Sequence, residues 1–395
     1  MKILHVTYYG QKMGGAEVIL FRTLEALEET GIQNVLVYQF PSPEAETRWP
    51  AYQVDGLGDP DGSNPLDTAK HFEEILQKEK PDLIHLYDIG NSFTAEISLA
   101  SAPTVQSIFN HNAYCPGGNK FLPFAGKICE RSYGPGCLTS AFLTHCCTIR
   151  PDKLYRSYRR SSQMMKRGNI PFLVLSRYQK NALIQNGFPE NQIIIHPPFT
   201  PVPEKNNSPD QFKNEILFTG RINSQKGWQP LLEALRLLRS DYTLVVDGDG
   251  PDLSKMKERA VQLGIIGKIK FVGWQDSRSH EENYRRSSMA VVPSVWAEPF
   301  GMVGIEAFSH QKPVVAFEVG GIPDWLENGS SGFLIRPYDI KQMSEKIDEL
   351  LSSPEKAKQM GAKGRARVEM EFTKEIYIKR LINIYETAVR QWQKP

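Results

Sequence analysis

The chain has 395 residues, of which 40% are hydrophobic and 23% charged, and its formal net charge is +2 at pH 7. A chain of this length exceeds what one hydrophobic core usually serves, so about two domains are expected. The near-neutral balance gives no sign of a nucleic-acid partner, and no apolar run reaches the roughly 18 residues that span a bilayer. The opening MKILHVTYYG is typical of a buried strand rather than a signal peptide, so we expect a cytoplasmic protein.

Short apolar runs alternate with longer amphipathic runs in the first half of the chain. This alternation is typical of the strands and helices of a doubly wound parallel sheet. The predicted strands are residues 3–7, 34–38, 83–86, 104–108, 172–175 and 192–196. Apolar residues at helical spacing predict helices over residues 16–29, 66–78 and 177–186.

The alternation repeats after a segment rich in proline and polar residues, 197–211, which is predicted to be a linker. The predicted strands of this second series are residues 215–219, 243–246, 268–272, 290–292, 313–316 and 333–335. The predicted fold is therefore α/β, with two Rossmann-like doubly wound domains, a cleft between them and a C-terminal helix crossing back to the first domain. The predicted boundaries are 1–197, 198–213 for the linker, 214–372, and 373–395 for the crossing helix.

Glycine loops follow the first strand of each series. In GQKMGGAE, residues 10–17, Gly14 and Gly15 would let backbone amides approach an anion at the positive end of the next helix. A purely structural turn is the alternative. In TGRINSQKG, residues 219–227, Arg221 and Lys226 could converge on one diphosphate, and a solvated basic loop is the alternative.

Two further strand ends carry less specific signals. The acids of VDGDGP, residues 246–251, could bind a metal-diphosphate, but Pro251 fits the first position of a helix and the acids are expected to cap that helix. Trp274, in FVGW, could meet a flat ring of a ligand or complete an edge of the core.

The stretch WAEPFGMVGIE, residues 296–306, combines two glutamates with a glycine turn. Gly301, at the predicted helix start, would present backbone amides and the positive end of the helix dipole to a diphosphate. Glu306, further into the helix, could accept hydrogen bonds from ribose hydroxyls, and Glu298 would face the group beyond the phosphates. For the glutamates alone, a capping acid and a surface acid would explain the pattern as well; their combination with Arg221 and Lys226 favours a ligand site.

These motifs together resemble the retaining GT-B glycosyltransferases of family four. The resemblance rests on the seven residues between Glu298 and Glu306, on EPFG, on KPVVAFEVGGIPDWLENGSSGFLI, and on GGAE, GR with a later KG, and GDGP in the same order. It implies two Rossmann-like domains with an interdomain active site. The implied reaction is sugar transfer from a nucleotide diphosphate sugar with retention of the anomeric configuration, uridine being the commoner base.

The resemblance also implies roles for individual residues. Arg221 and Lys226 would stabilise the leaving diphosphate, so that no dedicated metal is required. Glu298 would hold the donor sugar, Glu306 the ribose, and His111, in FNHNAYCP, would face the reacting sugar from the acceptor domain. The predicted catalytic set is His111, Arg221, Lys226 and Glu298, and the predicted donor-binding set is Gly14, Gly15, Gly220, Trp274, Phe300, Gly301, Met302, Val303 and Glu306.

All five cysteines lie in a long loop predicted at residues 111–150, which would border the acceptor site. They are Cys115, Cys129, Cys137, Cys146 and Cys147. Their spacings lack the tight C-x-x-C pairs of common zinc modules. Free thiols are one interpretation, and a structural zinc held by three or four thiolates is the other. No further cofactor is expected.

The segment 150–167 is strongly basic, with seven Lys or Arg residues against one Asp. Helical spacing would set Leu154, Tyr155 and Tyr158 beside these bases, as on a helix that rests on anionic lipid headgroups at the inner face of a membrane. A solvated helix, or a pocket for a phosphorylated acceptor, fits the same pattern.

The sequence therefore predicts a retaining enzyme of polysaccharide or glycoconjugate biosynthesis that moves a sugar to a carbohydrate, sugar-phosphate or lipid-linked acceptor. Two other classes stay open. One is a catalytically silent nucleotide-sugar-binding assembly subunit. The other is a sugar-nucleotide epimerase on the same fold, which would need internal acid and base residues and no acceptor loop.

Overall fold

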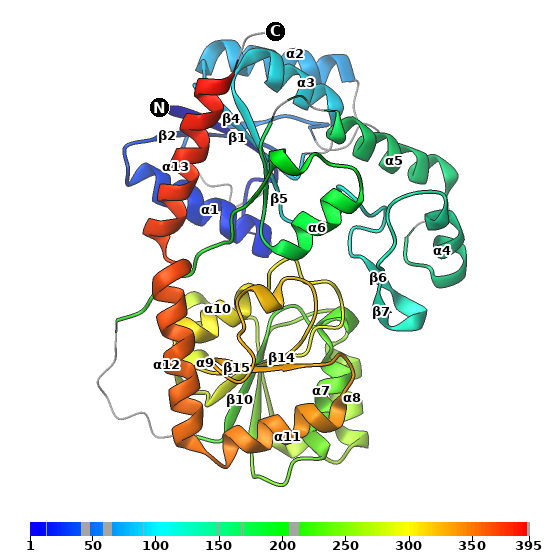
Figure 1. Ribbon diagram of the computed structural model, residues 1–395, viewed down its shortest axis with the longest axis vertical. Coiled ribbons are helices and arrows are strands. Elements are labelled where there is room, and N and C mark those ends of the chain that lie inside the picture. Colours follow the sequence, from blue (N-terminus) through cyan, green and yellow to red (C-terminus); the bar gives the residue numbers. More distant parts are fainter. Residues whose placement is uncertain are drawn as a thin grey trace. The chain divides into compact units, whose positions relative to one another are not determined.

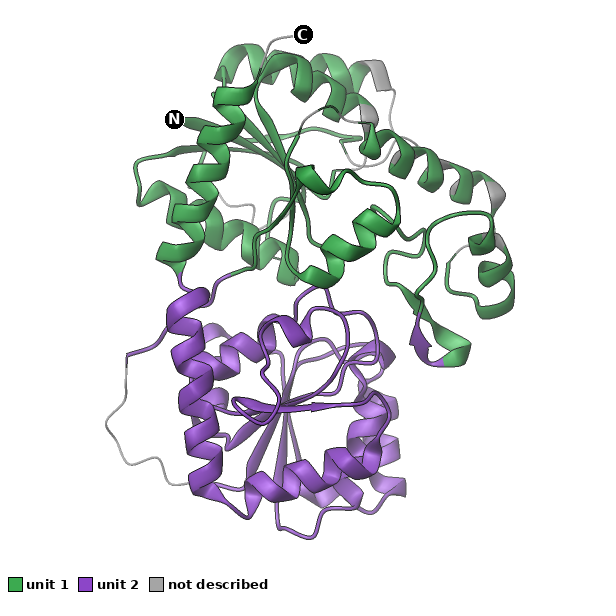
Figure 2. Cartoon of the chain, viewed as in Figure 1, with its two compact units in different colours: residues 1–125, 129–198, 374–395 green, residues 126–128, 199–373 purple. Residues whose placement is uncertain are grey.

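The computed structural model describes residues 1–12, 14–40, 48–57, 65–89, 91–147, 150–166, 168, 170–204 and 213–392. The chain divides into two compact units, each built on a parallel sheet with helices beside it (Figures 1 and 2). Unit 1 comprises residues 1–125, 129–198 and 374–395, and unit 2 comprises residues 126–128 and 199–373. The predicted α/β class with two doubly wound domains is confirmed.

The sheet of unit 1 is parallel at every described pairing. Its strands lie in the order β3 (Ala51–Gln53), β2 (Gln33–Phe40), β1 (Lys2–Tyr9), β4 (Leu83–Tyr87), β5 (Thr104–Ile108), β8 (Phe172–Val174) and β9 (Ile193–Ile195). Strands β4 and β5 are buried at every residue, as expected where helices cover both faces of a parallel sheet.

The described helices of unit 1 are α1 (Gly15–Glu28), α2 (Pro65–Glu79), α3 (Ser92–Ser101), α4 (Gly136–Thr144), α5 (Pro151–Met165), α6 (Arg177–Gln185) and α13 (Lys374–Gln391), with a 3-10 turn η2 (Glu190–Gln192). Two buried hydroxyls anchor α13 within this unit. Tyr377 Oη lies 3.0 Å from Thr23 Oγ1, and Tyr385 Oη lies 2.7 Å from His85 Nδ1. The C-terminal helix is thus part of the unit formed by the first half of the chain.

Residues 111–150 are not the structureless loop that was predicted. They contain β6 (Phe121–Leu122), the 3-10 turn η1 (Pro123–Ala125), β7 (Lys127–Ile128) and α4. The prediction was wrong because these elements are short and lie among glycines and prolines, so that no apolar period develops. The next helix, α5, begins at Pro151, where a missing N–H costs nothing.

In unit 2 the strands lie in the order β12 (Ile269–Gly273), β11 (Thr243–Asp247), β10 (Glu215–Thr219), β13 (Met289–Val292), β14 (Val314–Phe317) and β15 (Gly332–Ile335). Its described helices are α7 (Trp228–Arg236), α8 (Leu253–Gln262), α9 (Ser277–Arg286), α10 (Met302–Ser309), α11 (Ile340–Leu351) and α12 (Pro354–Glu371). Its 3-10 turns are η3 (Ser224–Lys226), η4 (Ile266–Lys268) and η5 (Ile322–Asp324). The chain runs outward from β10 to β12 and then returns to β13, so the strand order reverses between β10 and β13.

Candidate functional site

The reversal of strand order sets two loops side by side at the carboxyl ends of β10 and β13. The loop after β10 carries Arg221 and η3, and the loop after β13 carries Glu298. A backbone hydrogen bond of 2.9 Å, from the N–H of Val295 to the carbonyl of Gln225, joins the two loops. Ligands of open parallel sheets bind at such reversal points. The crevice between these two loops is therefore the expected ligand site of unit 2.

An ion pair lies in this crevice. Lys226 Nζ is 2.7 Å from Glu298 Oε1, and Ser294 Oγ donates to the same oxygen at 2.6 Å. The Glu298 side chain is 5% exposed and that of Lys226 is 27% exposed. Burial by itself would raise the pKa of Glu298, but the Lys226 ammonium and the two hydrogen bonds outweigh it and hold the pKa below its ordinary value. The carboxylate therefore stays ionised beside a cation that reaches the surface.

Helix α10 starts at the same crevice. Its N-cap, Gly301, has φ +89°, a left-handed conformation that favours glycine, and no side chain caps the helix. Met302 and Val303 form the partly exposed first turn. The ring of Phe300 is buried against Phe372, so a contact of Phe300 with a ligand would have to come from its backbone. The helix start thus offers backbone and the positive end of a dipole.

Glu306 is held from a neighbouring helix. The hydroxyl of Tyr284, on α9, lies 3.2 Å from the carbonyl of Val303 and 3.4 Å from Glu306 Oε2. The buried Tyr284 ring packs edge-on against His280 and stacks on His310, with ring centroids 5.1 Å apart in both cases. Tyr284 is therefore fixed on both sides and can orient the carboxylate of Glu306.

The aspartates of VDGDGP do not cap a helix, and that prediction was wrong. Asp247 Oδ2 accepts hydrogen bonds from His280 Nδ1 at 2.7 Å and from Asn283 Nδ2 at 2.9 Å. Helix α8 begins later, at Leu253, without a side-chain cap. Asp247 instead fixes α9, the helix that carries Tyr284. The sequence of α9, SRSHEENYRR, has no apolar period that could have indicated this role.

Of the remaining predicted residues of unit 2, Gly220 and Arg221 lie on the loop after β10, at the crevice, whereas Trp274 lies further away. Arg221 is exposed and forms no salt bridge with any residue that the structure describes, and Gly220 before it has φ +119°. Trp274 follows β12, two strands away from β10, and is 70% exposed. Two strand spacings amount to about 10 Å, so Trp274 stands apart from the Lys226–Glu298 pair.

Unit 1 carries the other predicted residues. Gly14 is the N-cap of α1, with φ −164°, and a Cβ at Gly15 would meet no atom within 4 Å. Neither backbone strain nor packing therefore requires glycine at these two positions. His111 is fully buried, with Nδ1 2.5 Å from Tyr114 Oη and its ring edge-on to that of Tyr178. In this structure its side chain is held by aromatic neighbours.

Residues 202–367 match the sequence model of a family described as "Glycosyl transferases group 1". Over 403 aligned residues the chain is 24% identical to the O-antigen chain mannosyltransferase C of Escherichia coli, covering 98% of this chain and 99% of that one. Residues 202–367, most of unit 2, thus resemble the group 1 glycosyl transferases, in agreement with the resemblance that the glutamate motif indicated.

Other relatives are matched over part of their length. An uncharacterized glycosyltransferase of Methanocaldococcus jannaschii is 28% identical over 176 residues, 44% of this chain and 45% of that one. The chain spans less than half the length of the first curated relatives that it matches. Two solved structures share the fold: a glycosyltransferase of Rickettsia africae (TM-score 0.77, 18% identity, 99% of each chain) and Anabaena HepE in complex with UDP (TM-score 0.76, 17% identity, 98% and 100%). The predicted GT-B fold is confirmed.

The five cysteines are free and partly buried. The sulfurs of Cys146 and Cys147 are 4.0 Å apart. Burial, together with the neighbouring Cys146, Cys115 and Cys137, raises the pKa of Cys147 to about 12. Within the described ranges no three His, Cys, Asp or Glu side chains are arranged to hold a metal ion, so the zinc interpretation gains no support. Nor is any described helix long and apolar enough to cross a bilayer.

Proposed function

We propose that this protein is a group 1 glycosyl transferase that moves a sugar from a nucleoside diphosphate sugar, most simply a UDP-sugar, to a carbohydrate, sugar-phosphate or lipid-linked acceptor, with retention of the anomeric configuration. The observation that carries the proposal is the Lys226–Glu298 ion pair, 2.7 Å long, at the crevice between β10 and β13. Arg221 lies exposed on the loop of Lys226, and Gly301 opens α10 beside Glu298.

The chemistry follows from these groups. When the bond between the anomeric carbon and the phosphate oxygen breaks, negative charge grows on the diphosphate, and Arg221 and Lys226 neutralise it. Glu298 accepts hydrogen bonds from sugar hydroxyls and Glu306 from the ribose. The acceptor hydroxyl attacks the same face of the sugar, and its proton passes to the departing phosphate, so no glutamate needs to form a covalent intermediate.

The names of the relatives support a nucleotide-sugar donor but do not identify it. Anabaena HepE was solved with UDP, which names a nucleotide but no sugar, and the Escherichia coli relative is a mannosyltransferase, which names a sugar but no nucleotide. The test is a donor panel: purified protein with UDP-, GDP- and ADP-sugars, scored for nucleoside diphosphate release with and without acceptor mixtures. Acceptor-dependent release from one donor would support the transferase. Tight nucleoside diphosphate binding without release would favour a silent subunit, and conversion of a donor into its epimer without acceptor would favour an epimerase.

The exposed Arg221 gives the first prediction. Arg221→Ala is expected to lower kcat at least tenfold, because one cation facing the leaving diphosphate is lost. Steady-state turnover with the donor from the panel measures it, and Arg239→Ala, at another exposed arginine of unit 2, is the control. Unchanged turnover of Arg221→Ala would remove the leaving-group role.

Tyr284 gives the second prediction. Tyr284→Phe is expected to raise the donor KM about fivefold while kcat changes less than twofold, since a hydrogen bond of about 1 kcal/mol to the Glu306 side of the site is lost. Tyr242→Phe is the matched control, because the buried hydroxyl of Tyr242 has no hydrogen-bond partner among the described residues. Equal KM values for the two variants would contradict the positioning role of Tyr284.

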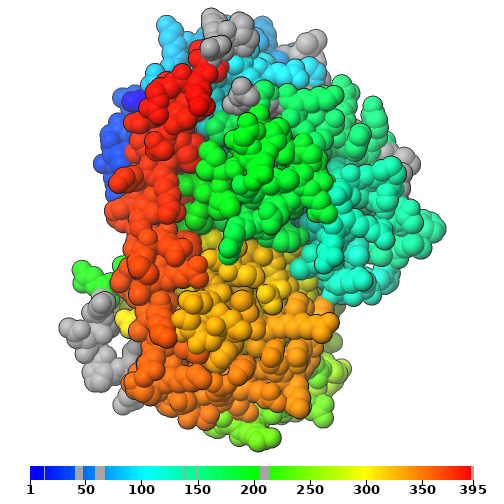
Figure 3. Space-filling model, viewed as in Figure 1, coloured from blue at the N-terminus to red at the C-terminus, as the bar shows by residue number. Residues whose placement is uncertain are grey.

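Membrane contact is part of the proposal. Large apolar side chains of α4, α5 and η1 are unusually exposed: Phe124 by 74%, Phe142 by 72%, and Leu143 and Tyr155 by 65% each. They belong to the cyan and green lobe of unit 1 (Figure 3). Proteins that act alone in water rarely expose such a group. Arg150 and Arg159, which are nearby in sequence, are also exposed and could bind anionic lipid headgroups. We therefore propose that this lobe contacts an anionic membrane surface that carries a lipid-linked acceptor.

The third prediction tests this lobe. Phe142→Ser with Leu143→Ser is expected to reduce co-sedimentation with anionic phosphatidylglycerol vesicles at least fivefold, because two apolar side chains no longer enter the interface. Val261→Ser is the control, since Val261 is 60% exposed on α8 of unit 2. Vesicle binding that is equal for both variants would contradict membrane contact through α4.

A further inference from the structure

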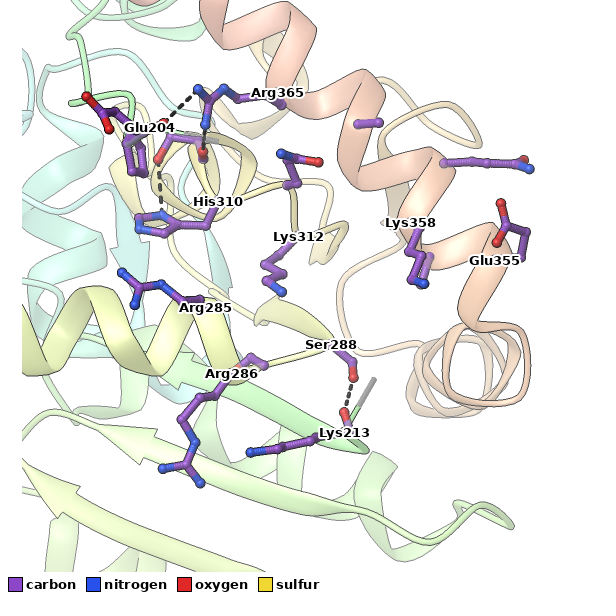
Figure 4. Close-up of a pocket in the computed structure, with 17 residues that line it drawn as sticks. Glu204, Lys213, Arg285, Arg286, Ser288, His310, Lys312, Glu355, Lys358 and Arg365 are labelled. Atoms are coloured by element: carbon purple, nitrogen blue, oxygen red, sulfur yellow. Dashed lines mark hydrogen bonds between the residues drawn. The ribbon is translucent and has the colours of Figure 1, made fainter. Parts of the chain in front are cut away.

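A hollow of about 720 Å³ lies in unit 2 at the edge of the sheet opposite the crevice (Figure 4). Its wall is formed where strands begin: Lys213 precedes β10, Ser288 precedes β13 and Lys312 precedes β14. The amino ends of parallel strands share one edge, and a five-residue strand is about 16 Å long. The hollow is therefore separate from Arg221, Lys226 and Glu298, which follow the carboxyl ends.

Basic side chains dominate the wall. Among the described residues that line the hollow, six are Lys or Arg, whereas the carboxylates are Glu204 and Glu355. The lining lysines are Lys213, Lys312 and Lys358, and the lining arginines are Arg285, Arg286 and Arg365. Figure 4 shows them coming from α9, α12 and the starts of strands, around one open space. Such a wall attracts an anion.

A structural role accounts for the arginines. Arg285 and Arg286 lie in the last turn of α9, where their positive charges interact favourably with the negative end of the helix dipole. Arg285 pairs with Glu282, and Arg286 pairs with Glu215. Arg365 is nearly buried, pairs with Glu369 and donates to the carbonyl of Ser309 at the end of α10.

Two of the lysines are not explained in this way. Lys213 and Lys358 form no salt bridge with any carboxylate in the described part of the chain, and both side chains are exposed. Lys312, in the turn before β14, lines a third side of the hollow. Three ammonium groups from three separate elements thus border the hollow.

Exposed amides complete the polar part of the wall. The side chains of Gln311 and Gln359 can hydrogen-bond to hydroxyls of a ligand, whereas the hydroxyls of Ser288 and Ser309 are buried and donate to the carbonyls of Lys213 and Glu306. The volume falls within the range of about 300 to 1,000 Å³ that small-molecule sites occupy. Lysine ammonium groups bind phosphate as point charges. We propose that this hollow binds a small phosphorylated polyol, whose phosphate is held by Lys213, Lys312 and Lys358 and whose hydroxyls meet the amides of Gln311 and Gln359.

The site is independent of the transferase proposal, and its test needs no turnover. Glucose 6-phosphate, inorganic phosphate and glucose are titrated calorimetrically into the full chain. The pocket variant carries Lys213→Ala, Lys312→Ala and Lys358→Ala. A charge-matched control carries Lys255→Ala, Lys257→Ala and Lys341→Ala, at exposed lysines of α8 and α11, two helices that do not line the hollow. Arg221→Ala reports binding at the crevice.

Glucose 6-phosphate is expected to bind the wild type with a Kd below about 1 mM, at least tenfold more tightly than phosphate or glucose. The pocket variant should lose at least tenfold in affinity, and the charge-matched control and Arg221→Ala should stay within twofold. A variant with only Lys213→Gln and Lys358→Gln, which keeps polar side chains, should show the same direction of loss. The melting temperature of each variant verifies folding.

Several results would overturn the proposal. One is that the wild type fails to bind glucose 6-phosphate at 5 mM, which is about five times the expected upper limit of Kd. If the pocket variant and the charge-matched control lost affinity for glucose 6-phosphate equally, the loss would be due to the change in net charge and not to the hollow. If only Arg221→Ala lost affinity, the phosphate would bind in the crevice. Equal affinities for phosphate and glucose 6-phosphate would remove recognition of the polyol.

Discussion

A Lys226→Ala variant is expected to turn over at least 100-fold more slowly than the wild type and to unfold more easily. The activity falls because a cation facing the departing diphosphate is lost, an effect of the size seen when one preorganised group is removed. The stability falls because Glu298, only 5% exposed, keeps its charge without its ammonium partner. Since Lys226 itself reaches solvent, we expect about 2 kcal/mol rather than the larger cost of a fully buried pair.

Turnover with the donor from the panel and urea unfolding measure the two effects separately. Adding Glu298→Gln to Lys226→Ala should restore part of the stability, because the unpaired charge is removed, but none of the activity. Lys270→Ala is the control, since its pair with Glu215 is 3.4 Å long and its side chain is 57% exposed. Turnover of Lys226→Ala within threefold of the wild type would refute the assignment of the crevice as the catalytic centre.

The second large effect is expected at Gly320, which precedes η5. Its φ is +54°, and a Cβ there would lie 2.2 Å from the carbonyl oxygen and 2.5 Å from the nitrogen of Glu298. The next residue, Gly321, donates its N–H to the same carbonyl at 2.8 Å. Gly320→Ala should therefore push the backbone of Glu298 away, lowering turnover at least tenfold and stability by about 3 kcal/mol.

Gly329→Ala is the matched control for this experiment. Gly329 has φ +76°, so alanine meets similar backbone strain, but a Cβ there would have no neighbour within 4 Å. We expect a loss of about 1 kcal/mol and normal turnover for Gly329→Ala. If Gly320→Ala and Gly329→Ala had the same activity, the close contact between Gly320 and Glu298 would not be needed to position Glu298. Urea unfolding and turnover of both variants decide this.

The strands were predictable because their residues are strongly apolar and β-branched. All six predicted strands of unit 2 correspond to observed ones, although some ends differ by one residue; the predicted strand at 268–272 is β12 (Ile269–Gly273). The crevice was also predictable, since a loop that follows a parallel strand must lie at the carboxyl edge. Arg221, Lys226 and Glu298 each follow such a strand.

Other parts of the site depend on tertiary packing that leaves no periodic trace. Asp247 reaches across to His280 of α9, and Tyr284 of the same helix reaches Glu306, although nothing in the spacing of these residues joins them. Phe300 sits in the glutamate motif, yet its ring belongs to the core. The three lysines of the hollow are far apart in sequence; the shared edge of the sheet brings Lys213 and Lys312 together, and α12 adds Lys358.

The neighbouring positions of β10 and β13 have a consequence for how the chain folds. These strands pair in register, Ile216 with Met289, although β11, β12 and three helices are synthesised between them. Closing so long a loop costs entropy before any crevice contact forms. Lys226 and Glu298 therefore meet only after most of the sheet of unit 2 is complete. Recovery of activity during refolding should accordingly lag behind recovery of helical circular dichroism.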